Sequence, residues 1–266
     1  MRSFRGARAG SLPAAVVFFF LLGASSCSRD GDVPATEAVQ RLDHFFLARM
    51  DPPQSGWLLC DRFELTRGEY EPEGLRPDPD LPVVMISVQE FNAWADPRGL
   101  RAPTVAEWRA LAGSPEANPS LSPLSRNTLD LGIGAALPVG VFERGRSPLG
   151  GYDFFGNVRE LAGPIEGGRY LALGGSFATR AAGADVSEAV RVEAGDRADD
   201  LGVRAVADAS TYLREQVLPA WQANPKSAGP ALLAAARSWR ADLRTGLAEQ
   251  LRREGFPSGF VLLLAP

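Results

Sequence analysis

Two oxygen-bearing side chains three residues apart, Asn157 and Glu160, offer the clearest chemistry in this sequence. They belong to residues 150–161, which read GGYDFFGNVREL and are followed by GGSF at 174–177. Gly156, just before Asn157, can adopt a positive φ or let another backbone approach closely. An Asn and a Glu in such a turn can hydrogen-bond the backbone or bind a hard cation such as calcium. The sequence leaves both interpretations open.

Histidine and cysteine chemistry is scarce in this chain. His44 is the only histidine and has no paired cysteines beside it, so a zinc site is not expected. A Ser-His-Asp triad could use only His44, and no serine stands in a nucleophile-elbow pattern. Cys60 lies in a predicted strand at 57–66, where the pattern favours a buried thiol over a reactive thiol or an intermolecular bridge.

Several short segments, in chain order, resemble signatures of the formylglycine-generating enzyme family, also called the sulfatase-modifying-factor domain. Residues 150–161 resemble GLYDMxGNVWEW, residues 63–70 (FELTRGEY) resemble EVTxxxY, and residues 101–108 (RAPTVAEW) resemble RLPTEAEWE. The segments PVG at 138–140, GGSF at 174–177 and LGVR at 201–204 resemble PVG, RGGSW and IGFR. The resemblance covers roughly residues 54–207. It implies an α+β fold of the C-type-lectin-like kind, with much irregular structure.

The same resemblance makes the departures informative. Catalytic members carry two cysteines just after GGS(W/F), which hold copper and activate oxygen. The matching positions here are Thr179 and Ala184, and Ser176 and Phe177 would line the remaining groove. A hydroxyl and a methyl cannot hold copper(I) as thiolates do, so copper is not expected.

The resemblance also implies a calcium ion at the turn, held by Asn157, Val158 and Glu160 through side-chain and backbone oxygens. Arg159 and Leu161 replace two tryptophans of the family signature. Because Arg159 places a cation beside the turn, it weakens the calcium interpretation.

Residues 1–27 are typical of a secretory signal peptide. Three arginines precede a short apolar run at 12–22 and a small-residue exit at 23–26. The run is too short for a bilayer span of about 20 residues. Cys27 follows the small residues as in a bacterial lipoprotein, which predicts lipidation of Cys27, export, and a location at the cell membrane or outer membrane. Ordinary signal cleavage is the alternative.

The charge balance argues against nucleic acid as a partner. Removing the first 26 residues takes away three of the 28 basic residues and none of the 32 acidic ones, so the formal charge changes from −4 to −7. Binding to phosphates requires clustered positive charge.

The chain is expected to have four parts: a signal peptide (1–27), a tether with an N-terminal helix (28–53), the sulfatase-modifying-factor-like domain (54–207), and a C-terminal helical appendage with a short terminal strand (208–266). The N-terminal helix is expected from Thr36 to about Met50. Within the domain we expect helices at 89–95 and from Thr104, the latter with a capping box to Glu107. Residues 114–150 are expected to be irregular, 170–173 and 201–206 to be paired strands, and 178–200 to be an acidic surface loop.

The C-terminal part combines an apolar stripe with basic residues. A helix is expected at 211–223 and another from Pro230 to about Gly255, and the latter carries Leu232, Ala236, Trp239, Leu243, Leu247 and Leu251 at helical spacing. The opposite face would carry Arg237, Arg240, Arg244, Arg252 and Arg253. These helices pack on the domain or on each other, or they form a docking surface or a basic face near anionic lipid. The run 260–264 is expected to be a buried strand.

Three functions fit these observations. The first is a non-catalytic, membrane-anchored binding or scaffold protein with envelope protein partners. The second is a sulfatase-maturing oxidoreductase with an atypical site, for which Cys60 alone cannot supply a copper pair. The third is a related iron-dependent, sulfur-transferring enzyme, whose histidine cluster His44 alone cannot provide.

Overall fold

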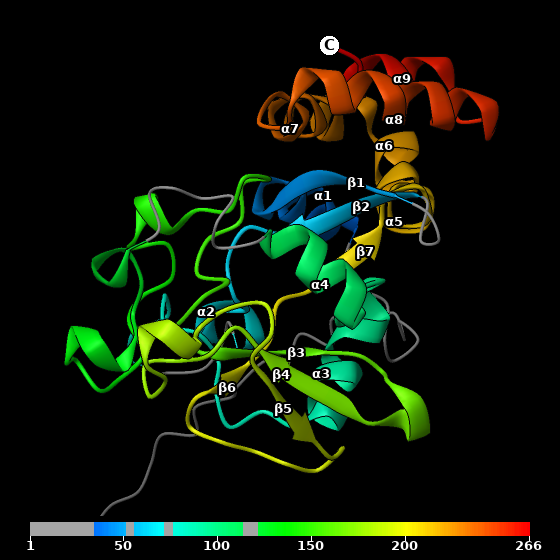
Figure 1. Ribbon diagram of the computed structural model, residues 1–266. Coiled ribbons are helices and arrows are strands. Elements are labelled where there is room, and N and C mark those ends of the chain that lie inside the picture. The colour runs from blue at the N-terminus through cyan, green and yellow to red at the C-terminus, as the bar shows by residue number, and fades with distance from the viewer. Residues whose placement is uncertain (1–34, 52–55, 72–76, 114–121) are drawn as a thin grey trace, which may run out of the picture. The chain divides into compact units, whose positions relative to one another are not determined.

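The computed structural model describes residues 35–51, 56–71, 77–113 and 122–266. The expected signal peptide (1–27), Cys27 and the tether residues 28–34 lie outside these described residues. The described part combines two small sheets, short capped helices and a C-terminal group of helices in an α+β fold (Figure 1). No helix in it has the length and apolar character needed to cross a bilayer.

The first sheet joins early and late parts of the chain. Strands β1 (Phe45–Met50), β2 (Gly56–Asp61) and β7 (Val206–Asp208) are antiparallel in the order β1-β2-β7. The expected helix from Thr36 to Met50 is wrong in its second half, because α1 (Ala35–Arg41) and a 3-10 turn (Leu42–His44) end before β1. Four consecutive residues of β1, 45–48, are buried, which fits a strand covered on both faces better than a helix with one apolar stripe.

The second sheet has the order β5-β4-β3-β6. Its strands are β3 (Arg159–Ala162), β4 (Tyr170–Leu173), β5 (Ala189–Val192) and β6 (Leu201–Gly202), and only the β3–β6 pair is parallel. The strand at 170–173 is confirmed. The expected pairing of 170–173 with 201–206 is wrong, because β6 pairs with β3 and Val206 belongs to the first sheet.

The acidic segment 178–200 is not a loop throughout, because it contains β5. Three of the four β5 residues are exposed, so this edge strand lacks the buried apolar side chains that reveal a strand in a sequence.

Three short helices begin with the same device. The helices are α2 (Arg67–Tyr70), α3 (Val88–Ala95) and α4 (Val105–Ala112). In each, the side chain of a capping Ser or Thr accepts from the backbone N–H of the third helical residue. That residue is a Glu, and its carboxylate accepts from the backbone N–H of the capping residue. The helix near 89–95 and the capping box of Thr104 and Glu107 are confirmed. Such boxes fix the residue at which each helix starts, and therefore the residue at which the preceding loop ends.

The segment expected to be irregular, 114–150, is irregular where it is described. From residue 122 onward it contains only 3-10 turns, at Pro123–Ser125, Leu129–Leu131 and Glu143–Gly145. In Figure 1 this green stretch lies to one side of the two sheets.

The C-terminal residues form more helices than expected. After α5 (Ala209–Tyr212), a π-helical turn (Leu213–Val217) and α6 (Leu218–Ala223) come α7 (Pro225–Arg237), α8 (Ala241–Arg253) and α9 (Ser258–Leu264). Pro230 therefore lies inside α7, which starts earlier because Asn224 caps it and Pro225 fits its first turn. The helix expected to continue to Gly255 is interrupted after Arg237, where Trp239 turns inward and its indole N–H donates to the carbonyl of Phe45 (3.1 Å).

The expected terminal strand is a helix. Residues 258–264 form α9, in which Phe260, Val261 and Leu264 are buried while Leu262 is exposed. These three positions have the spacing of one helical face, which a five-residue apolar run is too short to reveal.

One continuous core joins the first sheet to the C-terminal helices. It includes Leu47 and Leu59 from the sheet together with Leu232, Leu247 and Phe260 from α7, α8 and α9. The apolar stripe expected on the C-terminal helices is thus buried against the rest of the described chain, apart from the half-buried Leu243. Arg244, expected on the basic face, is instead buried and donates to the carbonyls of Leu264 (3.0 Å) and Ala265.

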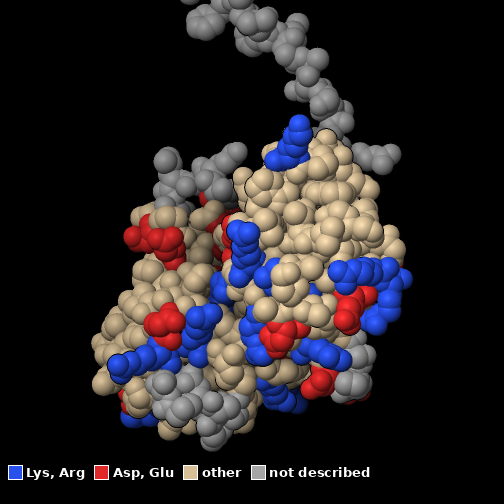
Figure 2. All heavy atoms as spheres, turned by 90° about the horizontal axis from the view of Figure 1, so that it is seen from above, with Lys and Arg blue, Asp and Glu red and all other residues tan. Residues whose placement is uncertain are grey.

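The remaining charges of this end are mixed in sign. Arg240 pairs with Asp242 (2.7 Å) and Arg214 pairs with Glu254 (3.3 Å). Figure 2, which looks onto the end that carries the C-terminal helices, shows basic side chains interspersed with acidic ones. The surface does not display one continuous basic patch in this view.

Candidate functional site

Asn157 holds three separate loops together. Its side-chain amide donates to Glu64 (3.1 Å) and to the carbonyl of Leu137 (3.2 Å), while its oxygen accepts from Asn127 (3.0 Å) and from the backbone N–H of Leu137 (2.9 Å). Asn157 has a φ of 54°, a conformation that Asn tolerates better than most residues. The donors and the acceptor of this side chain are therefore all occupied by protein partners at the turn.

Gly156 permits the close approach on which this turn depends. Its φ is 95°, and a Cβ at this position would lie 2.5 Å from the carbonyl oxygen of Asn127. That is closer than any real Cβ contact, so only glycine allows the backbone N–H of Asn157 to reach the same carbonyl at 2.7 Å.

Glu160 belongs to a different network, in the interior. Its carboxylate accepts from Arg204 (2.6 and 3.1 Å) and from the indole N–H of Trp108 (2.7 Å). The side chains of Glu160 and Arg204 are both completely buried. Arg204 also donates to the carbonyls of Asp61 (3.0 Å) and Tyr152 (2.5 Å) and lies over the ring of Phe154. This pair ties β3 to the loop before β7 and to α4.

Two further carboxyl groups line the inner side of the turn. Burial raises the pKa of Glu64 well above its usual value, and the charges of Asp153 and Glu160 raise it further. Burial also raises the pKa of Asp153 to about 6. Both accept backbone N–H groups, Glu64 from Val158 and Asp153 from Gly140 (2.6 Å). Both carboxyl groups therefore have a structural role as acceptors for backbone N–H groups.

These contacts do not fit a calcium ion held jointly by Asn157 and Glu160. The oxygen of Asn157 already accepts two N–H groups, and the oxygens of Glu160 are bonded to Arg204 and Trp108. Calcium needs six to eight oxygen ligands that are free to face one point. Among the described residues, no group of three or more His, Cys, Asp or Glu side chains is placed to hold a metal.

The GGSF segment closes a second tight turn. Ser176 is completely buried, its hydroxyl donates to Asp200 (2.7 Å), and its backbone N–H donates to the hydroxyl oxygen of Thr179 (3.1 Å). Asp200 in turn pairs with Arg159 (3.0 Å). Phe177 is half-buried and its N–H donates to the carbonyl of Asn157 (2.9 Å). Ser176 and Phe177, the two residues predicted to line a groove, are thus held close to the start of β3.

The two positions expected from the family's cysteine pair come together around one glycine. A Cβ on Gly175 would lie 3.1 Å from a Thr179 methyl carbon and 3.0 Å from the Cβ of Ala184. Thr179 is half-buried and Ala184 is completely buried. The fold therefore brings these two positions together. Thr179 offers a methyl and a hydroxyl group there, and Ala184 offers a methyl group.

Cys60, the cysteine in the described part of the chain, cannot supply the missing copper ligands. Cys60 is buried on β2 with its thiol donating to the carbonyl of Asp61 (3.4 Å). Burial raises the pKa of this thiol well above its usual value, so it stays protonated. Thr179, Ala184 and Cys60 together do not fit copper(I), which takes deprotonated thiolates.

The single histidine lies in an ionic chain that sequence reasoning missed. His44 contacts Glu69 (2.7 Å), Glu69 contacts Arg41 (3.2 Å), and Arg41 contacts Asp61 (2.6 Å). The hydrogen bond to Glu69 raises the pKa of His44. Burial acts to raise the pKa of Glu69, but the bond from His44 and the charge of Arg41 lower it to about 2. The capping box at Thr66 could have shown that Glu69 has a fixed side chain, but no local signal indicates that this side chain meets Arg41 and His44.

Residues 60–209 match the family model described as the sulfatase-modifying factor enzyme 1-like domain. The chain belongs to this family. A comparison with curated proteins gives no match.

Solved structures similar to this member of the sulfatase-modifying-factor family include three proteins. Treponema denticola variable protein 1 is 16% identical, with 57% of this chain and 84% of that chain covered and a TM-score of 0.44. CarF is 18% identical, with 61% and 92% covered and a TM-score of 0.48. PvdO from Pseudomonas aeruginosa is 17% identical, with 58% and 81% covered and a TM-score of 0.49.

Proposed function

We propose that this protein is a non-catalytic binding or scaffold protein built on a sulfatase-modifying-factor domain. The observation that carries the proposal is the convergence of Thr179 and Ala184 around Gly175. The two positions that match the family's cysteine pair lie close together, but neither offers a thiolate. Because one fold can carry many different functions, a domain without the family's reactive groups can still serve in binding, which is the role we propose.

The proposed location is a bacterial membrane, to which lipidated Cys27 would attach the chain after export. The partners are then proteins of the same envelope, and nucleic acid is not among them. The support is the sequence of residues 1–27 and the acidic balance of the rest of the chain.

The proposal is tested first by chemistry. The purified chain is incubated in air with a cysteine-containing sulfatase peptide, with and without copper, and mass spectrometry follows the mass loss of aldehyde formation. We expect no turnover above a control without protein. The matched variant Thr179→Cys/Ala184→Cys restores thiols at the two converging positions, and we expect it to bind copper(I) while the natural chain does not.

Turnover by the natural chain that disappears in Cys60→Ser would contradict the proposal and make this protein a sulfatase-maturing oxidoreductase with a relocated site. A pull-down from the native envelope fraction gives the second test. A stable multiprotein assembly supports the scaffold role, whereas a sulfatase as the captured protein supports the maturation role.

A further inference from the structure

Residues 128–135 form a closed loop within the irregular segment that Figure 1 shows to one side of the two sheets. The side-chain amide of Asn127 donates to the carbonyl of Ala135 (2.9 Å), so the two ends of the loop meet. The 3-10 turn Leu129–Leu131 fills its first half. Compact loops whose ends lie close together frequently carry function.

This loop reverses the usual placement of polar and apolar side chains. Asn127 and Thr128, at its base, are 1% and 0% exposed, whereas Leu129 and Ile133 are 46% and 47% exposed. Large apolar side chains that are exposed beside buried polar ones are the informative exception in a folded protein. Asn127 also donates to the side-chain oxygen of Asn157 (3.0 Å). The loop therefore cannot turn over to bury its apolar side chains without breaking this interior hydrogen bond.

Ile133 lies at the tip of the loop, between two glycines. Gly132 and Gly134 have φ values of 76° and 72°, so the chain turns on both sides of Ile133. A Cβ added at either glycine would have no atom within 4 Å apart from its chain neighbours. The tip therefore projects away from the rest of the described chain.

Asp130 is the one charged residue of the loop, and its charge is compensated. Its carboxylate accepts the backbone N–H of Ala181 (2.5 Å) and lies 3.8 Å from the guanidinium of Arg180. The Arg180 side chain is 77% exposed, so a cation stands in solvent beside the loop. Exposed arginines are attracted to the negative surface of membranes that contain anionic lipids.

We propose that the tip of this loop inserts into the surface of a lipid bilayer. Leu129 and Ile133 enter the acyl region, and Arg180 contacts the lipid phosphates. The composition of the tip favours lipid over a protein partner, because protein–protein hot spots are enriched in Trp, Tyr and Arg and poor in Leu. The tip carries aliphatic side chains and glycines. This inference rests on the membrane location proposed above.

The length of the chain before α1 is consistent with this contact. With Cys27 lipidated, the seven residues 28–34 separate the anchor from the start of α1. A chain of that length spans at most about 25 Å. A compact unit of the size of Gly31–Pro266 has a diameter of about 45 Å. The tether is thus shorter than the unit is wide, so the surface of the unit stays within reach of the bilayer.

Flotation with lipid vesicles tests the proposal on residues 28–266, the chain without its signal peptide and without an acyl group. This form contains the whole compact unit Gly31–Pro266, and its binding cannot depend on lipidation. We expect it to float with vesicles of phosphatidylethanolamine and phosphatidylglycerol. Ile133→Asp and Leu129→Asn should each weaken binding at least about tenfold, because each withdraws an aliphatic side chain from the bilayer. The matched control is Leu262→Asn on α9, where Leu262 is 67% exposed, and it should leave binding unchanged.

A fluorophore at the tip measures insertion directly. Cys60 is buried, so a polarity-sensitive thiol reagent will label the new cysteine of Ile133→Cys. Its emission should shift to the blue when vesicles are added, whereas the same label on Leu262→Cys should not shift. Thermal melting verifies that each variant is folded.

The proposal is overturned if residues 28–266 do not float, if Ile133→Asp floats as well as the natural sequence, or if Leu262→Asn loses as much binding. It is also overturned if Ile133→Asp keeps vesicle binding but no longer captures an envelope protein that the natural sequence captures, since the tip would then dock on protein. None of these outcomes bears on lipidation of Cys27 or on the scaffold role, which fatty-acid labelling and the pull-down test separately.

Discussion

Replacing Glu160 by Gln should show that this residue is an interior ion-pair partner. Glu160 and Arg204 are both completely buried, and the carboxylate accepts from Arg204 at 2.6 and 3.1 Å and from Trp108 at 2.7 Å. Removing one partner of a buried pair leaves the other charge uncompensated, which costs about 3–5 kcal/mol. Because Gln keeps part of the hydrogen bonding, we expect a loss of about 3 kcal/mol in the free energy of unfolding. That is a large share of a typical total of about 5–15 kcal/mol.

Urea unfolding of the purified chain at pH 7, followed by circular dichroism, measures this change. The control is Asp242→Asn, which removes a carboxylate paired with Arg240 on the surface, and it should have no resolvable effect. The double variant Glu160→Gln/Arg204→Met should recover part of the loss, because neither charge of this pair then remains. A loss below about 1 kcal/mol in Glu160→Gln would refute the reasoning, since the pair would then be worth no more than a surface pair.

Three further outcomes are expected. Millimolar calcium or a chelator should leave the melting temperature unmoved, because Asn157 and Glu160 have committed their oxygens to protein donors; a shift upward with calcium would restore the calcium site. The pKa of His44 is raised in the folded state, so its pair with Glu69 stabilises the fold fully below about pH 6.5 and loses this effect as the pH rises through the folded pKa. The difference in unfolding free energy between the natural chain and His44→Gln should therefore be larger at acidic than at alkaline pH, and an equal difference would contradict the pairing. Cells fed an alkyne fatty acid should label the natural chain but not Cys27→Ser, and equal labelling would exclude lipidation at Cys27.

The family core was predictable because local signals and tertiary structure agree there. The capping box at Thr104 and Glu107 fixes the start of α4 by backbone hydrogen bonds that involve only neighbouring residues. The turn at Gly156 and Asn157 was recognisable because glycine and asparagine are the residues that tolerate its backbone conformation. The sequence could not show which of its two interpretations holds, because the partners of Asn157 and Glu160 come from distant segments.

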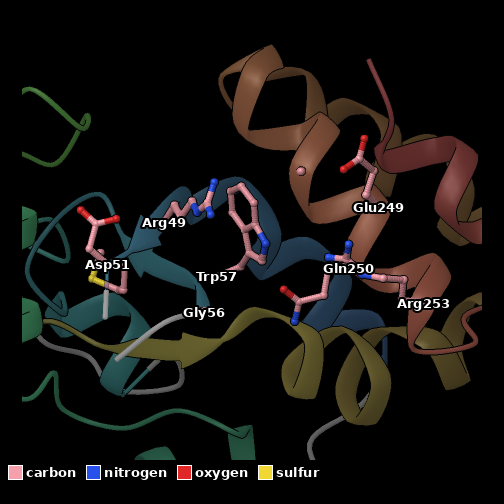
Figure 3. A pocket seen from close by; sticks show the side chains of 9 residues that line it. Arg49, Asp51, Gly56, Trp57, Glu249, Gln250 and Arg253 are labelled. Atoms are coloured by element: carbon pink, nitrogen blue, oxygen red, sulfur yellow. The ribbon is translucent and has the colours of Figure 1, made fainter. Parts of the chain in front are cut away.

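The errors fall where long-range packing decides the structure. Phe45–Met50 has apolar residues that suit a helix as well as a strand, and it becomes a strand because Gly56–Asp61 pairs with it. The helical form of 258–264 depends on burial against α7 and α8. The close approach of α8 to Trp57 at Gly246 (Figure 3) was equally invisible, since the two residues lie far apart in the sequence.

The order of strands in the first sheet constrains when the protein can fold. Leu58 on β2 lies opposite Asp208 on β7, so this sheet is complete only after a loop of about 150 residues has closed. Closing such a loop costs on the order of 4 kcal/mol in chain entropy, before any contact made beyond it repays that cost. Folding should accordingly be slow for a chain of this size, as is usual when distant pairings dominate. A nascent chain still lacking its last 60 or so residues would leave the edge of β2 and the apolar side of β1 uncovered, open to pairing with other chains.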